Sequence, residues 1–145
     1  MVDAALGTFV DRLIEAGEIG AADVARLASL LPAGIGARQE ADILIALDKA
    51  VACKDPAWDA FLVPALVDFV LRSSRPHGRV DRATAEWLTT SLGCGAGPSD
   101  NALAVAFAVV RRSELCHEVL VSSVMGWARG LKAGALARDW GLAPA

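Results

Sequence analysis

The sequence predicts an all-α protein, a compact bundle of seven to eight helices around a central buried helix at about residues 56–72. Three observations support this prediction. Apolar residues recur at helical spacing in the segments between turns, and no stretch alternates with period two for long enough to form a strand. With 145 residues, 54% of them apolar, the chain can also bury the core of one domain.

The central helix is predicted from the residues that open it and from the apolar stripe that follows. Asp55 suits the N-cap, and Pro56 suits the first helical position, where no N–H group is needed. The stripe has i, i+3, i+4 and i+7 spacing and consists of Trp58, Phe61, Leu62, Ala65, Leu66 and Phe69. Aliphatic side chains also occupy the opposite side. We therefore expect this helix in the middle of the core, with Phe61 at the centre of its stripe.

The other helices are predicted from the same periodicity and from the Gly, Pro and Ser residues between them. They are expected over 3–16, 21–31, 37–53, 81–92, 99–112 and 114–129. Asp81 is the expected N-cap of the fifth helix, and Ser99 or Asp100 that of the sixth. A short C-terminal docking helix is expected over 131–140, within a single domain of residues 1–145.

A weak internal repeat aligns Leu27, Leu44 and Leu88, each in a helix that follows a Gly-containing turn. These turns resemble the second half of an EF-hand loop. Counting back from Gly17 and Gly78, the places of the first three calcium ligands hold Arg12, Ile14 and Ala16, and Ser73, Arg75 and His77. A calcium loop needs oxygen ligands at these places. We therefore predict degenerate EF-hand-like turns that bind no calcium.

Charge, hydropathy and cysteines limit the function classes. A net charge of −3 argues against a general nucleic-acid binder. The longest apolar run, Ala102 to Val110, is about half of the roughly 20 residues that span a bilayer, so we expect no membrane span. The cysteines Cys53, Cys94 and Cys116 are odd in number and widely spaced, which favours reduced thiols. Because the first residues also lack the basic region of a secretory signal, we expect a cytoplasmic protein.

Carboxylates at the corner between the third and fourth helices are candidate ligands for Mg²⁺ or Ca²⁺; they are Asp42, Asp48, Asp55 and Asp59. Each also has an ordinary role. Asp55 is a helix cap, Asp42 is a solvated charge, and Asp59 lies favourably in a first helical turn. Asp48 can pair with Lys49 or Lys54. We favour the ordinary roles and expect no metal and no cofactor, with Asp48, Asp55 and Asp59 as the metal candidates.

A basic run is a candidate site for an anion or an acidic partner, and it contains Arg72, Arg75, His77, Arg79 and Arg82. Arginines beside the free N–H groups of a helix N-terminus can bind phosphate. The ordinary alternative is a solvated loop. The glycine-rich segment over 93–100 lacks the lysine and the preceding strand of a phosphate loop, so we expect a helix connector there.

Cys116, His117 and Glu118 supply the residue types of a catalytic triad, with Cys53 as a further thiol. Adjacent residues on a helix point about 100° apart, so Cys116 and His117 are not expected to meet. Two scattered cysteines and one histidine are also too few for a zinc site. We therefore expect no enzymatic activity.

The C-terminal part combines aromatic and aliphatic residues with basic ones, a composition favoured at protein interfaces. The candidate interface consists of Trp127, Leu131, Leu136 and Trp140, beside Arg129, Lys132 and Arg138. The alternative is that the same residues fold back and close the bundle.

Two segments resemble the helical TerB-like (tellurite-resistance TerB-like) proteins of bacteria, over about residues 17–125. The matching residues are Glu40, Ala41, Asp42, Asp48, Trp58 and Phe61, then Gly78, Val80, Ala85, Trp87 and Leu88. The resemblance implies a compact helical domain with an acidic surface, tied to stress responses and scaffolding, with a metal site in some members. This chain has few clustered carboxylates in its first two helices. We therefore expect a non-enzymatic binding or scaffold module with a protein partner or self-association, the alternative being a metal- or small-ligand-binding stress-response protein.

Overall fold

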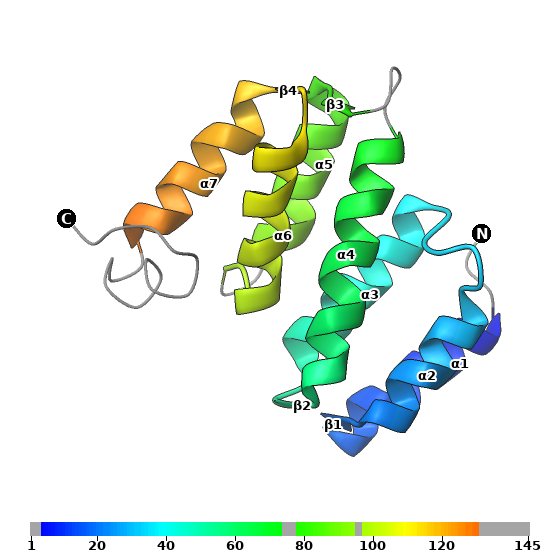
Figure 1. Ribbon diagram of the computed structural model, residues 1–145. Coiled ribbons are helices and arrows are strands. Elements are labelled where there is room, and N and C mark those ends of the chain that lie inside the picture. The colour runs from blue at the N-terminus through cyan, green and yellow to red at the C-terminus, as the bar shows by residue number, and fades with distance from the viewer. Residues whose placement is uncertain (1–3, 74–77, 95–96, 131–145) are drawn as a thin grey trace. The chain divides into compact units, whose positions relative to one another are not determined.

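The computed structural model describes residues 4–73, 78–94 and 97–130, which form helices joined by very short strands (Figure 1). The elements are α1 (Ala4–Ala16), β1 (Glu18–Ile19), α2 (Ala21–Leu30), α3 (Arg38–Ala50), β2 (Cys53–Lys54), α4 (Pro56–Ser73), β3 (Arg79–Val80), α5 (Arg82–Gly93), α6 (Asp100–Arg112), β4 (Leu115–Cys116) and α7 (Glu118–Gly130). The predicted all-α class is confirmed. The docking helix predicted over 131–140 lies outside the described residues.

The chain divides into two compact units, Met1–Phe69 and Val70–Ala145, and the boundary falls inside α4. The first unit contains α1 to α3 and most of α4. The second contains the last residues of α4 and all of α5 to α7. The single domain expected for residues 1–145 stays a prediction.

The strands pair in parallel, β1 with β2 in the first unit and β3 with β4 in the second (Figure 1). The expectation of no strands was therefore wrong in detail, as were the helices expected to run through 51–53 and 114–117. Strands of two residues are too short to show a period in the sequence. Their bonds also come from distant partners, such as the Asp55 N–H that donates to the Ile19 carbonyl over 2.8 Å.

The second unit repeats the first at a nearly constant spacing. Glu18 pairs with Cys53, and Arg79 pairs with Leu115, so the two pairs are 61 and 62 residues apart along the chain. The helices α3 and α6, both of 13 residues, show the same spacing of 62 between their first residues. Each unit thus consists of two helix–strand–helix halves whose strands pair.

The turns that open the repeated strands are also equivalent. Gly17 and Gly78 precede β1 and β3 with φ of 74° and 87°, a left-handed conformation that favours glycine. The predicted repeat is corrected at one position. Leu27 does match Leu88, but Leu44 matches Ala106, because Leu44 lies on the first helix of its half and the other two leucines lie on the second.

The caps predicted from the sequence are formed. Asp55 accepts from the Ala57 N–H over 2.9 Å and Asp81 accepts from the Thr84 N–H over 2.8 Å. Ser99, not Asp100, caps α6. These bonds satisfy N–H groups that have no partner within their own helix.

The helix α4 buries Trp58 completely, together with Leu62, Leu66, Val67, Phe69 and Val70. Phe61 is only half-buried, so its expected place at the centre of the stripe was wrong. Its ring lies beside that of Trp58, with centroids 6.1 Å apart. Asp59, Pro64 and Asp68 share an exposed line along α4, so the helix is not apolar all round.

Candidate functional site

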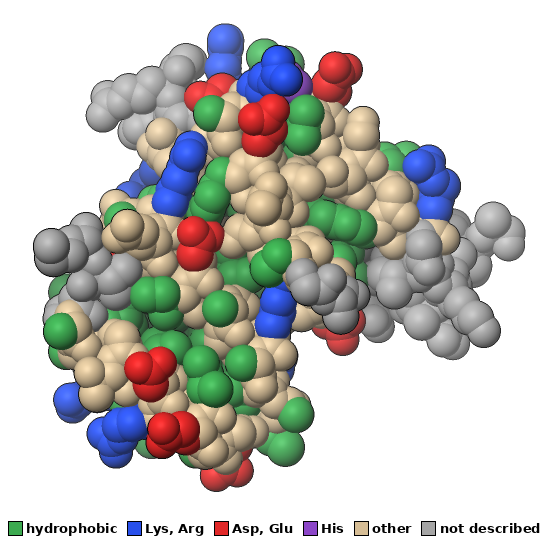
Figure 2. Space-filling model, turned by 180° about the vertical axis from the view of Figure 1, so that it is seen from behind, with side chains coloured by type: hydrophobic (Ala, Val, Ile, Leu, Met, Phe, Trp, Pro, Cys, Tyr) green, Lys and Arg blue, Asp and Glu red, His purple; other side chains and the backbone are tan. Residues whose placement is uncertain are grey.

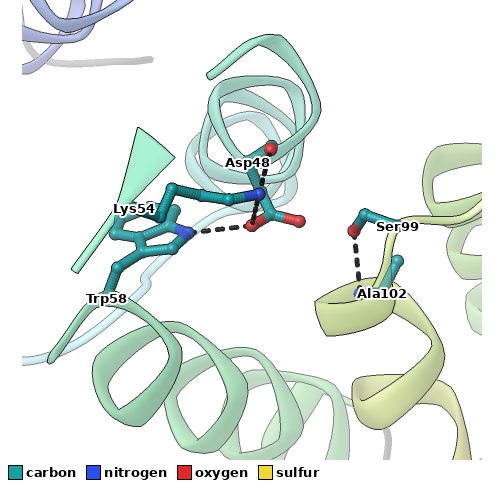
Figure 3. Close-up of polar contacts among 5 residues, drawn as sticks. All are labelled: Asp48, Lys54, Trp58, Ser99 and Ala102. Atoms are coloured by element: carbon teal, nitrogen blue, oxygen red, sulfur yellow. Dashed lines mark hydrogen bonds and ion pairs between the residues drawn. The ribbon is translucent and has the colours of Figure 1, made fainter. Parts of the chain in front are cut away.

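The buried carboxylate of Asp48 lies at the centre of a polar cluster in the first unit (Figure 3). Asp48 is 2% exposed. Its Oδ1 accepts from the Trp58 indole Nε1 over 2.8 Å and lies 3.2 Å from the Lys54 Nζ. The same ammonium donates to the Asp48 carbonyl oxygen over 2.8 Å. Lys54, with two polar contacts to Asp48, and Trp58, with one, therefore close the corner between α3 and α4.

The position of each member follows from local structure. Asp48 lies in the last turn of α3 on its inward side, next to Leu47 and one turn after Leu44. Lys54 belongs to β2, and Trp58 lies in the first turn of α4. The pairing of Asp48 with Lys54 settles the choice of lysine that the sequence left open. A buried carboxylate needs such donors, because a charge without partners is costly in the interior.

The second unit has no such cluster at the equivalent positions. A spacing of 62 residues places Val110, Cys116 and Leu120 where the first unit has Asp48, Lys54 and Trp58. The same fold therefore has a polar corner in the first unit, and apolar side chains with a thiol at the equivalent corner of the second. The cluster is a specific feature of the first unit and not a requirement of the architecture.

The metal candidates do not converge. Asp48 is occupied by Lys54 and Trp58, Asp55 accepts from the Ala57 N–H, and Asp59 lies exposed on α4. In the part of the chain that the structure describes, no group of three or more His, Cys, Asp or Glu side chains is placed to hold a metal ion.

The last ligand place of an EF-hand loop lies six residues after its glycine. From Gly17 this place holds Asp23, whose Oδ2 accepts from the Gly20 N–H over 2.9 Å and so helps to cap α2. From Gly78 it holds Thr84, which is buried. The closing place after Gly17 therefore stabilises a helix start, and the one after Gly78 holds a buried hydroxyl residue.

The basic candidates are only partly assembled. Arg72 and Arg79 are exposed, while Arg82 pairs with Glu86 over 2.9 Å on the surface of α5. The hydrogen bond and charge of Glu86 raise the pKa of Arg82. Asp81 caps α5 and so takes up one of the N–H groups that an anion would use. Two further candidates, Arg75 and His77, lie outside the described residues.

Backbone bonds bring the end of α4 and the strands β3 and β4 together. The Gly78 N–H donates to the Leu71 carbonyl over 2.9 Å, and its carbonyl accepts from the Glu114 N–H over 2.7 Å. Arg79 is the register partner of Leu115. This junction therefore places Arg79 beside an apolar residue from a segment far along the chain.

Three large hydrophobic side chains are exposed among the described residues. They are Leu115 at 61%, Met125 at 53% and Ile14 at 40%. Figure 2 shows hydrophobic side chains at the surface between acidic and basic ones. Sequence analysis did not single out these residues. Ile14 could have been recognised, because the buried residues Leu6, Val10 and Leu13 already complete the inward stripe of α1.

Trp127, from the candidate C-terminal interface, is half-buried against α5. A Cβ atom at Gly93 would lie 2.9 Å from the Trp127 Cζ2, so the ring occupies the space that glycine leaves open. Trp127 therefore packs within the second unit. The other candidates of that interface, Leu131, Leu136 and Trp140, lie outside the described residues.

Cys116 and His117 do not form a nucleophile–base pair. The His117 Nδ1 accepts from the Val119 N–H over 3.1 Å, which makes the imidazole the N-cap of α7 at the position equivalent to Asp55. The Cys116 Sγ faces the His117 carbonyl oxygen at 3.7 Å. Burial raises the pKa of the Cys116 thiol, and a hydrogen bond with Ser113 offsets part of that rise. The thiol is therefore poorly activated as a nucleophile.

Within the described residues, no helix is both long and apolar enough to cross a membrane. The chain matches no family model, no curated protein and no solved structure.

Proposed function

We propose that the protein is a non-enzymatic binding or scaffold module of the TerB-like kind, acting in the cytoplasm. The observation that carries the proposal is the exposure of Leu115, Met125 and Ile14 on a framework of two repeated helical units. Large apolar side chains ringed by polar ones are typical of protein interfaces. The proposal assigns these side chains to partner contacts.

The state of the polar groups supports binding over catalysis. The His117 Nδ1 is engaged in capping α7, and the Asp48 carboxylate is engaged by Lys54 and Trp58. These groups stabilise the fold where a hydrolase would need them free to move a proton. A surface that acts by recognition needs no such group.

Co-purification from the native host followed by mass spectrometry identifies the partner, and calorimetry with that purified partner then tests the surface. Met125→Asp is expected to weaken binding about tenfold or more, because a charge in an apolar contact is desolvated without a partner. Ala28→Asp, at an exposed position on α2, serves as the control and is expected to leave binding unchanged.

Two results would contradict the proposal. One is equal binding by the Met125→Asp variant and the unmodified protein. The other is the absence of any protein partner together with a metal-induced rise in melting temperature, which would favour the metal- or small-ligand-binding stress protein.

A further inference from the structure

Charge is divided unequally between the two units. Residues 1–69 contain 5 Lys and Arg against 11 Asp and Glu, a formal charge of −6. Residues 70–145 contain 9 Lys and Arg against 6 Asp and Glu, a formal charge of +3, and the two values sum to the −3 of the whole chain. The two segments of the chain thus carry opposite formal charge.

The difference is displayed at equivalent strands. Glu18 in β1 corresponds to Arg79 in β3, and both side chains are exposed. Exposed Glu15 and Ile14 lie in the last turn of α1, which leads directly into β1. We call Ile14, Glu15 and Glu18 the glutamate end of the first unit.

The strand pair of the second unit has an apolar residue among arginines. Leu115 in β4 is the register partner of Arg79, and α6 ends with Arg111 and Arg112 just before β4. These arginines are exposed and form no ion pair with a described residue. We call Arg79, Arg111, Arg112 and Leu115 the arginine end of the second unit.

We propose that copies of this chain associate head to tail, with the arginine end of one copy docked on the glutamate end of the next. Leu115 and Ile14 form the apolar centre of the contact, and the opposite charges form its rim, as in protein interfaces generally. The inference rests on the proposed function as a binding module and names its partner, a second copy of the chain.

Complementarity favours a second copy over an unrelated acidic protein, since an acidic partner would account for the arginine end alone. When two copies make this contact, one copy still has a free glutamate end and the other a free arginine end. Further copies can therefore add, which gives rings or open chains. Glu114 and Glu118 near the arginine end, and Arg12 near the glutamate end, offset part of the attraction. The association is therefore expected to be weak and sensitive to salt.

Light scattering and sedimentation of the purified full chain test the inference. At low ionic strength the average mass is expected to rise above one chain with increasing protein concentration. In about 1 M salt, where the Debye length is only about 3 Å, it should return toward one chain. Arg79→Glu and Glu18→Arg are each expected to weaken association about tenfold or more. Arg26→Glu, a charge reversal at an exposed position on α2, is the matched control and should leave association unchanged.

Mixing the two variants gives the sharpest result. Arg79→Glu keeps an intact glutamate end, and Glu18→Arg keeps an intact arginine end. The two altered ends are also opposite in charge, so an equimolar mixture should recover the association that each variant alone has lost. A mixture that stays monomeric, or single variants that associate like the unmodified chain, would overturn the inference. Circular dichroism melting of every variant separates lost association from lost folding. If the isolated chain is monomeric under all conditions this inference falls alone, because co-purification and calorimetry test the proposed function separately.

Discussion

The indole Nε1 of Trp58 donates to the Asp48 Oδ1 over 2.8 Å and joins the end of α3 to the start of α4. Trp58 is fully buried and Asp48 is 2% exposed, so water cannot replace the bond. A bond between two buried groups leaves a costly unpaired atom when one partner is removed. We therefore expect the bond between Trp58 and Asp48 to contribute more to the stability of the first unit's corner than the half-buried side chain of Lys54.

Replacing Trp58 with phenylalanine is expected to destabilise the protein by about 1–3 kcal/mol, since the Asp48 Oδ1 loses a donor. Urea unfolding followed by circular dichroism measures the change. A triple replacement with the second unit's residues, Asp48→Val, Lys54→Cys and Trp58→Leu, removes all the polar groups together. It should cost less per residue replaced than Trp58→Phe, because no buried charge is left unpaired. A Trp58→Phe variant as stable as the unmodified protein would show that the bond contributes nothing.

Because the His117 imidazole caps α7, the Ala and Asn variants at this position are expected to differ in stability. His117→Ala removes the acceptor for the Val119 N–H and should cost about 1 kcal/mol. His117→Asn supplies a side-chain oxygen as acceptor in place of the imidazole Nδ1 and is expected to recover most of the loss. Chemical denaturation of the three proteins provides the comparison, and equal stability of the Ala and Asn variants would argue against capping.

Gly93 leaves the space that the Trp127 ring fills, so a methyl group at this position must displace the ring or the backbone of α5. Gly93→Ala is expected to cost about 1–3 kcal/mol, in the range of overpacked cores. Adding Trp127→Phe, which lacks the ring that carries Cζ2, should recover part of that stability. If Gly93→Ala instead stabilises the protein, as alanine does in an open helix, the contact is not tight.

The three cysteines should differ in reactivity. Cys53 and Cys94 are exposed, whereas Cys116 is half-buried and burial raises its pKa. A thiol-specific reagent at neutral pH is expected to modify Cys53 and Cys94 first. Because the pKa of Cys116 is higher in the folded than in the unfolded chain, its contribution to stability is present at neutral pH and is lost as pH rises above the usual thiol value of about 8.5. Mass spectrometry of timed samples across pH checks the order, and early labelling of Cys116 would contradict it.

The helices and their caps could be predicted from the sequence because they depend on residues close together in the chain. Asp55, Asp81 and the hydroxyl of Ser99 act as their types and positions indicate. The strands could not, since each bridge of two residues depends on a partner far along the chain. The same reason explains why the expected place of Phe61 at the centre of the stripe was wrong: spacing places Trp58 and Phe61 on one face, but only packing decides which one is buried.

The candidate site was partly predictable. Sequence reasoning offered Lys49 or Lys54 as the partner of Asp48, and the choice needed the path of β2. It found the basic character of Arg79 but not its pairing with Leu115, which brings two distant segments together. The repeat was visible only as aligned leucines, because the two units share backbone bonds and burial more than residue identities.

We propose that this protein closes its EF-hand-like turns with its own groups and acts by binding proteins and not metal. Thermal unfolding of the purified chain, treated with EDTA and then titrated with Ca²⁺ or Mg²⁺, tests it most directly. We expect one melting temperature throughout, because Lys54 already engages the Asp48 carboxylate, and Asp23 and the strand bonds already occupy the turns. A ligand at 100 times its dissociation constant adds about 2.7 kcal/mol of stability. A rise of several degrees on adding either ion would therefore contradict the claim.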